Sequence, residues 1–263
     1  MASTKRVHLQ VESSQVIASG ISDPGCVRPE NEDSIWLDKA GNFVLLADGM
    51  GGHERGAEAS STSINVIRPY LNSAGMFADV EEITGGSGVP PEIVCVWSVV
   101  DEAVDKATGV LFERNQELQL QRFMGTTIVG LVMVQGDYVL WFHVGDSRLY
   151  LWRQSTLKRL TVDHSAHSEW VSNGRSGEEP GKNVITRAIG PHAAVVADIG
   201  WDERQKDDIF VLCSDGLSDM ISEEEIEHIL RDGTDVDHIA IRLIDAANDA
   251  GGKDNVSVIV CKT

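Results

Sequence analysis

The chain has 263 residues, of which 42% are hydrophobic and 24% are charged, and this composition is typical of a globular protein with a large core. Its formal net charge of −19 argues against nucleic acid as a partner, because binding to that backbone depends on Lys and Arg. No apolar run is long enough to span a membrane, and residues 1–15 lack the apolar block of a secretory signal. The four cysteines form no C-x-x-C pair, so neither a zinc site nor a disulfide framework is expected. We therefore expect a cytoplasmic monomer with one domain, residues 1–263, and no membrane contact.

Apolar patterns predict short strands that alternate with helices along the chain. The strands are expected at residues 16–21, 34–38, 42–48, 128–134, 138–144, 148–153, 194–199, 208–213 and 256–260. The helices are expected at residues 56–71, 92–118, 223–231 and 236–250, where apolar residues recur with a helical period. Two polar, glycine-bearing segments, 73–91 and 161–183, are expected to be loops, the second with one helical turn. The short links between residues 128 and 153 favour antiparallel pairing.

One short apolar run, Phe43-Val-Leu-Leu-Ala, ends at Asp48 and a glycine-rich turn, Gly49-Met-Gly-Gly-His53. The run suits a strand that is buried on both faces, so its last carboxylate is expected at the rim of the core. The glycines leave backbone carbonyls open to a ligand or an ion. An Asp-Gly hairpin turn explains the same residues equally well, and this stretch alone does not decide between the two interpretations.

Three more aspartates occupy similar positions at the ends of predicted strands. Asp146 and Asp215 each follow an apolar run, and Asp254 comes just before the last one. Each alone is explained by turn formation. Together with Asp33 and Asp48 they would repel one another unless cations compensate their charge. An all-oxygen ligand set favours Mg²⁺ or Mn²⁺, and two such ions that share a carboxylate can generate a bridging hydroxide that attacks phosphorus.

The segment before Asp33 is unusually polar for a link between two apolar strands. It contains Arg28, whose planar guanidinium fits two phosphate oxygens, although a solvated loop explains the segment as well. A second polar segment, Asp163-His-Ser-Ala-His167, has the spacing of a metal-binding pair, but its polar context favours a solvated loop. The chain contains no glycine-rich nucleotide-binding motif that opens a helix.

Eight motifs in a fixed order resemble the metal-dependent type 2C protein phosphatases of bacteria, the PPM family, over nearly the whole chain. They are Ser22-Asp-Pro-Gly-Cys-Val-Arg-Pro-Glu-Asn-Glu-Asp33, Ala47-Asp-Gly-Met-Gly-Gly-His53, Gly125-Thr-Thr127, Val144-Gly-Asp-Ser-Arg148, Leu160-Thr-Val-Asp-His-Ser165, Ile185-Thr-Arg-Ala-Ile-Gly190, Cys213-Ser-Asp-Gly-Leu217 and Gly252-Lys-Asp-Asn-Val256. Several motifs are weak individually, but the ordered set is specific.

The resemblance implies an α+β fold, a four-layer αββα sandwich in which helix pairs flank two antiparallel sheets. It also implies hydrolysis of phosphoserine and phosphothreonine in proteins at a binuclear Mg²⁺ or Mn²⁺ centre, which would reverse the action of a partner Ser/Thr kinase. Two alternatives remain: a phosphatase of small phosphate esters, and a pseudo-enzyme that binds phosphoproteins without cleaving them. A pseudo-enzyme would be expected to lack one or more of the acids.

The resemblance also implies a role for each matched residue. Asp48 matches the bridging metal ligand, and Gly49 matches a ligand that uses its backbone carbonyl. Asp215 and Asp254 match ligands of the first ion, and Asp33 matches the acid that holds the second. The remaining matches are Asp146, which with Asp215 would bind a third and looser ion, Arg28, which would bind phosphate, and His53, which lies near the family's proposed general acid.

Residues 165–183 match a flap beside the metal centre of the resembling family. Its glycines and few apolar residues predict low-cost local opening, so the segment is a candidate lid, although an ordinary mobile loop has the same composition. If the segment guides substrates, Arg175 and Lys182 would favour acidic phosphopeptides, while Glu178 and Glu179 would disfavour them.

Overall fold

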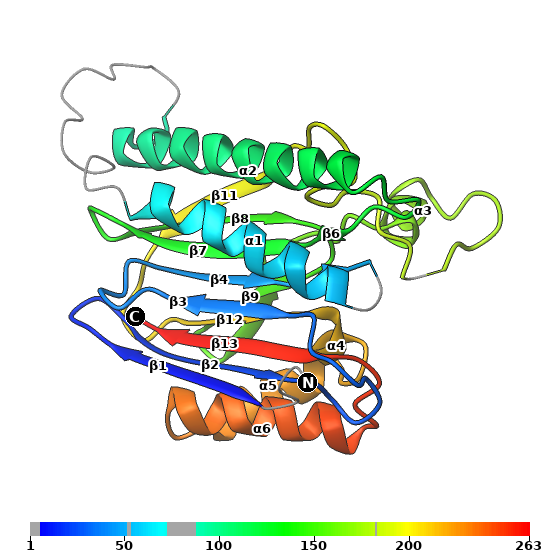
Figure 1. Cartoon of the computed structure of the whole chain (residues 1–263). Helices are drawn as coiled ribbons and strands as arrows, with labels where there is room; N and C mark the ends of the chain where they lie inside the picture. The colour runs from blue at the N-terminus through cyan, green and yellow to red at the C-terminus, as the bar shows by residue number, and fades with distance from the viewer. Residues whose placement is uncertain (1–5, 52–53, 73–87, 182) are drawn as a thin grey trace.

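Two antiparallel sheets lie face to face in the centre of this computed structural model, which describes residues 6–51, 54–72, 88–181 and 183–263 (Figure 1). The six-stranded sheet has the order β1 (Val7–Glu12), β2 (Ile17–Asp23), β13 (Val256–Lys262), β12 (Ile209–Cys213), β9 (Arg148–Arg153) and β10 (Thr156–Arg159). The five-stranded sheet has the order β11 (Asp198–Glu203), β8 (Tyr138–Val144), β7 (Ile128–Val134), β4 (Phe43–Ala47) and β3 (Ser34–Leu37). A third, two-stranded pairing joins β5 (Gly49–Met50) and β6 (Gly125–Thr126).

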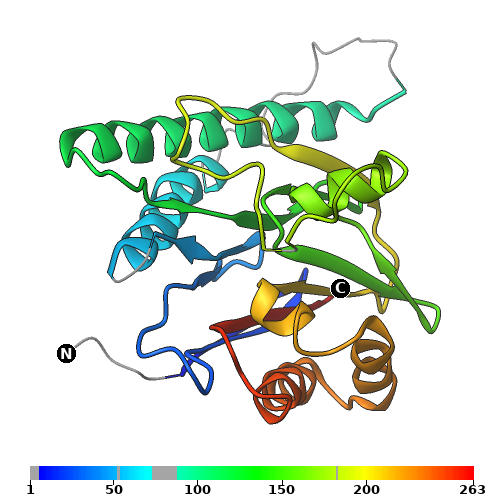
Figure 2. The same ribbon diagram turned by 90° about the vertical axis from the view of Figure 1, so that its right-hand side faces the viewer.

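Helices form the two outer layers (Figures 1 and 2). The long helices α1 (Glu54–Leu71) and α2 (Pro91–Glu117) cover the five-stranded sheet, and α5 (Glu223–Asp232) and α6 (Val236–Asp249) cover the six-stranded sheet. Two short helices, α3 (Ala166–Ser172) and α4 (Asp215–Ser218), lie outside these layers. The α+β sandwich with two antiparallel sheets, expected from the resemblance, is confirmed.

Three apolar layers hold the sandwich together: one between the sheets and one under each helix pair. Strands β4 and β7 are buried along their whole length, which explains why their sequences are continuous apolar runs rather than alternating ones. In α2 the buried residues recur every three or four positions, as the helical period requires for a single face on the sheet. Each large side chain that is fully buried contributes about 1.5–3 kcal/mol to folding.

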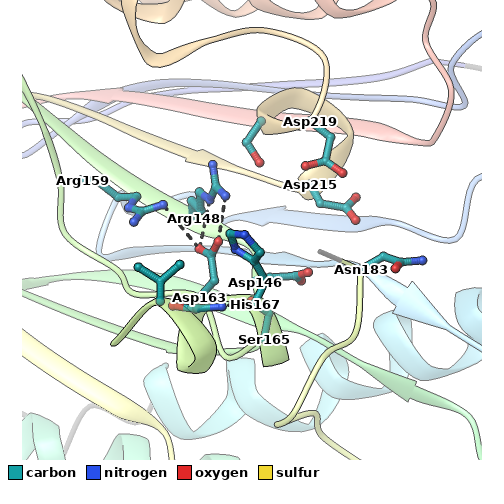
Figure 3. A pocket seen from close by; sticks show the side chains of 12 residues that line it. Asp146, Arg148, Arg159, Asp163, Ser165, His167, Asn183, Asp215 and Asp219 are labelled. Atoms are coloured by element: carbon teal, nitrogen blue, oxygen red, sulfur yellow. Dashed lines mark hydrogen bonds and ion pairs between the residues drawn. The ribbon is translucent and has the colours of Figure 1, made fainter. Parts of the chain in front are cut away.

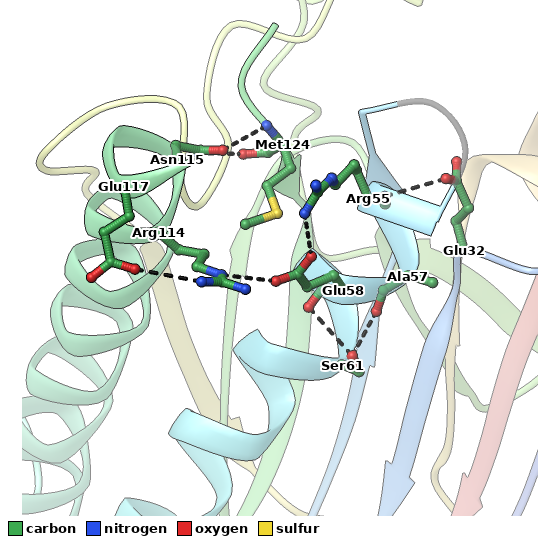
Figure 4. Close-up of polar contacts among 10 residues, drawn as sticks. Glu32, Arg55, Ala57, Glu58, Ser61, Arg114, Asn115, Glu117 and Met124 are labelled. Atoms are coloured by element: carbon green, nitrogen blue, oxygen red, sulfur yellow. Dashed lines mark hydrogen bonds and ion pairs between the residues drawn. The ribbon is translucent and has the colours of Figure 1, made fainter. Parts of the chain in front are cut away.

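Polar contacts join α1 to α2 and fix the chain that leaves α2 (Figure 4). Glu58 accepts hydrogen bonds from Arg55 at 2.8 Å and from Arg114 at 3.1 Å, and these partly exposed pairs contribute less than about 1 kcal/mol each. The buried side chain of Asn115 donates to the carbonyl of Met124 at 2.8 Å and to that of Gly190 at 3.0 Å, and it accepts from the Met124 amide at 2.9 Å. Asn115 thereby sets the path of the chain into β6.

The predicted elements agree with the structure except that one strand was misplaced and that β1, β10, the two short strands β5 and β6 and the short helix α4 were not predicted. The strand predicted at residues 194–199 is wrong, because β11 begins only at Asp198 and Val196 lies in a loop with 74% of its surface exposed. β11 is an edge strand with no buried residue, so its sequence carries little apolar signal. Strand β1 was not predicted, although Val7, Leu9 and Val11 alternate with polar residues as a half-buried edge strand requires. In the described part of the chain, no helix combines the length and the apolar character needed to cross a bilayer.

Candidate metal centre

Three of the predicted acids lie at one edge of the five-stranded sheet. Asp33 precedes β3 and Asp48 follows β4, and the register that pairs Ser34 with Ala47 places the two acids opposite each other. Asp146 follows β8 after a one-residue turn at Gly145, whose φ of 106° is readily adopted only by glycine. The apolar strands therefore end at carboxylates, as the sequence predicted.

The six-stranded sheet supplies the other two acids. Asp215 opens α4 directly after β12, and Asp254 lies just before β13. Since Cys213 of β12 pairs with Val258 of β13, the two acids leave neighbouring strands at the same edge. Figure 3 shows Asp215 and Asp146 directed into one pocket from opposite sheets. The acids thus converge across the seam between the sheets.

Burial and mutual repulsion raise the pKa of Asp33, Asp48, Asp146 and Asp215. Burial, followed by the charges of Asp33, Asp215, Asp146 and Asp254, raises the pKa of Asp48 well above its usual value. Burial and neighbouring charge also raise the pKa of Asp33 and of Asp146 to about 7, and that of Asp215 to about 6. The charged forms of these groups therefore lack sufficient compensation from the protein itself.

The donor set fits hard divalent cations. Both carboxylate oxygens of Asp33 and Oδ1 of Asp146 are buried, and no described residue offers them a hydrogen bond. The hydroxyl of Ser257, beside Asp33, donates instead to Ser22 at 2.8 Å. Buried carboxylate oxygens without donors, grouped in one place, are what Mg²⁺ or Mn²⁺ would bind, whereas zinc favours His and Cys.

Arg28 lies beside these acids, as the phosphate-binding prediction requires. Its Nη2 donates to Oδ2 of Asp254 at 2.6 Å, although the two residues are 226 positions apart in sequence. About half of the Arg28 side chain is exposed, so donors of its guanidinium remain accessible from solvent. The polar segment 22–33 is consequently part of the site rather than an unattached solvated loop.

Gly49 is buried and has no space for a side chain. A Cβ there would lie 2.1 Å from the carbonyl oxygen of Gly56 and 2.6 Å from that of Glu32. Glycine is therefore required by the close approach of α1 and of the loop before Asp33. The metal-ligand role of the Gly49 carbonyl remains a prediction. His53 lies outside the described residues, and its role as general acid remains a prediction as well.

The Gly125-Thr-Thr127 motif, to which the sequence assigned no role, fixes the position of Asp48. The Asp48 amide donates to Oγ1 of Thr127 at 3.0 Å, and the Thr127 amide donates to the Asp48 carbonyl at 2.8 Å. The hydroxyl of Thr126 donates to the same carbonyl at 2.7 Å. Oγ1 of Thr127 also lies 2.7 Å from Oγ of Ser147, the residue after Asp146. The motif thereby connects two of the acids.

Asn255 is a second positioning residue that the sequence did not reveal. Its side chain is buried, donates to the carbonyls of Pro24 and Glu30 at 3.0 and 2.8 Å, and accepts from the Glu32 amide at 2.8 Å. These three bonds hold the loop that carries Arg28 against the start of β13. The only signal in the sequence was the place of Asn255 next to Asp254.

Replacing Asn255 with alanine is expected to lower the free energy of unfolding by about 2–4 kcal/mol, because three hydrogen bonds to half-buried backbone groups are lost. Urea denaturation of the variant and the wild type measures this difference. Asn173→Ala is the matched control, since the Asn173 side chain is exposed and makes no hydrogen bond to the described residues. A loss no larger than that of the control would contradict the positioning role.

Two stacked histidines, His143 and His164, lie with Asp198 behind the Asp146 turn, with ring centroids 4.4 Å apart. Three such side chains can hold a transition metal, but the hydrogen bonds argue against it here. Nδ1 of His164 accepts from the Gly145 amide at 3.1 Å, so its proton resides on Nε2, which faces Asp198 at 3.2 Å. Burial lowers the pKa of His164 to about 4 and keeps the ring neutral. His164 therefore acts as a buried support for the Gly145 turn.

The prediction of a solvated loop for residues 163–167 is wrong at its first three positions, where Ser165 is buried and caps α3. His164 is buried, and Asp163 accepts two hydrogen bonds from Arg148, at 3.0 and 2.7 Å. These polar groups bond to β9, to the Gly145 turn and to the first turn of α3, so the polar sequence does not reflect exposure to solvent.

Comparison with known proteins agrees with this geometry. A sequence profile of the family described as protein phosphatase 2C matches residues 30–251. The chain belongs to the protein phosphatase 2C family. The serine/threonine phosphatase stp of Listeria welshimeri is 33% identical over 247 residues, which cover 91% of this chain and 92% of that protein. The family recognised from the eight sequence motifs is therefore confirmed.

Solved structures of two serine/threonine phosphatases have the same fold. The serine/threonine phosphatase of S. agalactiae superposes with a TM-score of 0.81 at 31% identity, over 94% of this chain and 99% of that one. The catalytic domain of the phosphatase PstP superposes with a TM-score of 0.78 at 32% identity, over 94% of this chain and 97% of that one. That PstP structure was solved in complex with two manganese ions.

Proposed function

We propose that this chain hydrolyses phosphoserine and phosphothreonine in proteins, at a centre of two Mn²⁺ or Mg²⁺ ions, and reverses the action of a cognate Ser/Thr kinase. Residues 1–263 would form one catalytic domain. The observation that carries the proposal is the convergence of five aspartates from both sheets, with buried oxygens that lack donors, beside a half-exposed arginine. The named activities of the relatives and the two manganese ions in PstP support it.

In this proposal Asp33, Asp48, Asp215 and Asp254 hold the two cations, and Asp146 with Asp215 offers a third, looser position. When bound, the cations polarise phosphate oxygens and make water nucleophilic near neutral pH. Thr127 and Asn255 keep the acids and the Arg28 loop in place through the hydrogen bonds described above.

Arg28 would bind the phosphate group. Its guanidinium carries several donors in a plane, which matches two phosphate oxygens and orients the ester for attack. The hydrogen bond to Asp254 holds Arg28 at the rim of the acid cluster, so a phosphate bound there would lie next to the cations.

The test is phosphate release from a phosphothreonine peptide with Mn²⁺ present and then with EDTA. We expect turnover that depends on the metal and that exceeds turnover of nucleotides and other small phosphate esters in kcat/KM. Higher kcat/KM on the small esters would favour a phosphatase of small phosphate esters instead. An absence of turnover with retained phosphopeptide binding would favour the pseudo-enzyme.

A further inference from the structure

A cavity of about 360 Å³ opens beside the acid cluster (Figure 3). Asp146 and Asp215 border it, so it is continuous with the site where the phosphate is proposed to bind. Arg159 of β10 lies on the opposite side of the cavity from Asp215 and Asp219 in Figure 3. The cavity volume of about 360 Å³ accommodates one or two amino-acid side chains, which is enough for a residue that flanks the phosphorylated position of the substrate.

One wall of this cavity is formed by α3. His167 and Val171 are one helical turn apart and line the cavity together with Ser168. No residue of α3 is buried. The N-terminus of the helix is capped by Ser165, whose hydroxyl accepts a hydrogen bond from the Ser168 amide at 3.2 Å. A helix with an open face beside a catalytic centre is suited to contact a substrate.

Three basic side chains line the cavity, and two of them form hydrogen bonds with carboxylates. Arg148 uses Nε and Nη2 to bind Asp163, and Nε2 of His167 lies 3.2 Å from Glu179. Arg159 is held more loosely, because among the described residues it forms only two long ion pairs. Its nearest carboxylate oxygens belong to Asp163 and Glu223, at 3.8 and 3.9 Å, and its guanidinium makes no hydrogen bond to any residue that the structure describes.

We propose that Arg159 forms a subsite for an acidic side chain next to the phosphorylated residue of the substrate. The proposal rests on the proposed function and specifies a substrate class for it. A carboxylate or a second phosphate provides the paired oxygens that a planar guanidinium binds best. In the proposed function cations compensate the charges of Asp146 and Asp215, and Arg148 compensates that of Asp163. Of the aspartates that line the cavity, this leaves the exposed Asp219 on the side away from Arg159. The subsite thus lies in the sheet and not in the flap, where Arg175 was expected to favour acidic peptides.

The experiment compares phosphothreonine peptides that differ at one neighbouring position, with Glu, Gln, Lys or a second phosphothreonine placed at each flanking position in turn. The wild type is expected to show a KM about 10-fold lower for the best acidic peptide than for its Gln counterpart, as one charge-assisted contact predicts. Arg159→Gln should reduce this ratio to about 1, while kinetics on a small aryl phosphate remain unchanged. The Glu and phosphothreonine arms identify which anion binds more tightly.

Arg175→Gln is the matched control, because Arg175 is exposed on the flap and does not line the cavity. It should retain the preference for acidic peptides. The proposal is overturned if Arg159→Gln leaves the ratio unchanged, if Arg175→Gln alone abolishes it, or if the wild type prefers the Lys peptides. Cleavage of the aryl phosphate without cleavage of any phosphopeptide would instead reject the proposed function, and the subsite with it.

Discussion

Asp48→Asn is expected to lower kcat/KM for a phosphothreonine peptide by at least about 1,000-fold and, in EDTA, to make the protein more stable than the wild type. Activity falls because the bridging ligand is lost. Stability rises because asparagine removes a buried charge that four other aspartates repel, a gain of about 1–3 kcal/mol near neutral pH. Steady-state kinetics with Mn²⁺ and thermal melting in EDTA measure the two effects.

Mn²⁺ should raise the Tm of the wild type but not that of the Asp48→Asn variant. Saturating Mn²⁺ is expected to raise the Tm of the wild type by about 5–10 °C. Since protons compete for acids whose pKa is raised to about 6 or 7, this increase should shrink as the pH falls from about 8 to about 6. Asp38→Asn is the control for Asp48→Asn, because Asp38 is also a buried aspartate but lies outside the cluster, where it accepts a hydrogen bond from the Asn42 amide at 3.1 Å. An unchanged Tm of the wild type with Mn²⁺ would reject the metal centre.

Arg28→Ala is expected to raise KM for the same peptide by about 10- to 100-fold and to lower kcat less, because the guanidinium binds phosphate in both the ground state and the transition state. Arg28→Lys should recover only part of the loss, since an ammonium group cannot bind two oxygens in one plane. Initial-rate kinetics over a range of peptide concentrations separate KM from kcat.

The control for Arg28 is Arg231→Ala. Arg231 lies on α5, is similarly exposed and also pairs with a carboxylate, that of Glu227. Its replacement should leave the kinetics unchanged. Kinetics of Arg28→Ala equal to those of the wild type would remove Arg28 from the site, and full recovery by lysine would show that charge alone is needed.

The sequence identified the acids because each one ends or begins an apolar run, which is a local pattern. It also placed α2 within one residue at each end, since Pro91 and the helical period mark its extent. Strand β11 was misplaced because an edge strand buries little and carries little periodicity. Local patterns therefore predict elements in proportion to how much apolar surface they bury.

The partners of polar groups were harder to predict, because they depend on segments that meet only after folding. Asn255 binds a loop 225 residues earlier, and Thr127 binds Asp48, 79 positions before it. The burial of His164 behind Gly145 likewise results from packing that a polar sequence does not reveal. Residue types thus indicated which groups do chemistry, whereas the residues that orient those groups became evident only in the folded chain.

The acid cluster lies across the seam between two sheets that otherwise meet through apolar side chains. Such contacts are non-directional, so they resist separation of the sheets more strongly than they resist sliding. Asp33, Asp48 and Asp146 move with one sheet, and Asp215 and Asp254 move with the other. Cations with fixed coordination distances would therefore hold the two sheets in one position relative to each other. Any partner that shifts one sheet relative to the other, even by binding to a helix on the outer surface, would change the affinity of the acid cluster for the cations without contacting the active site.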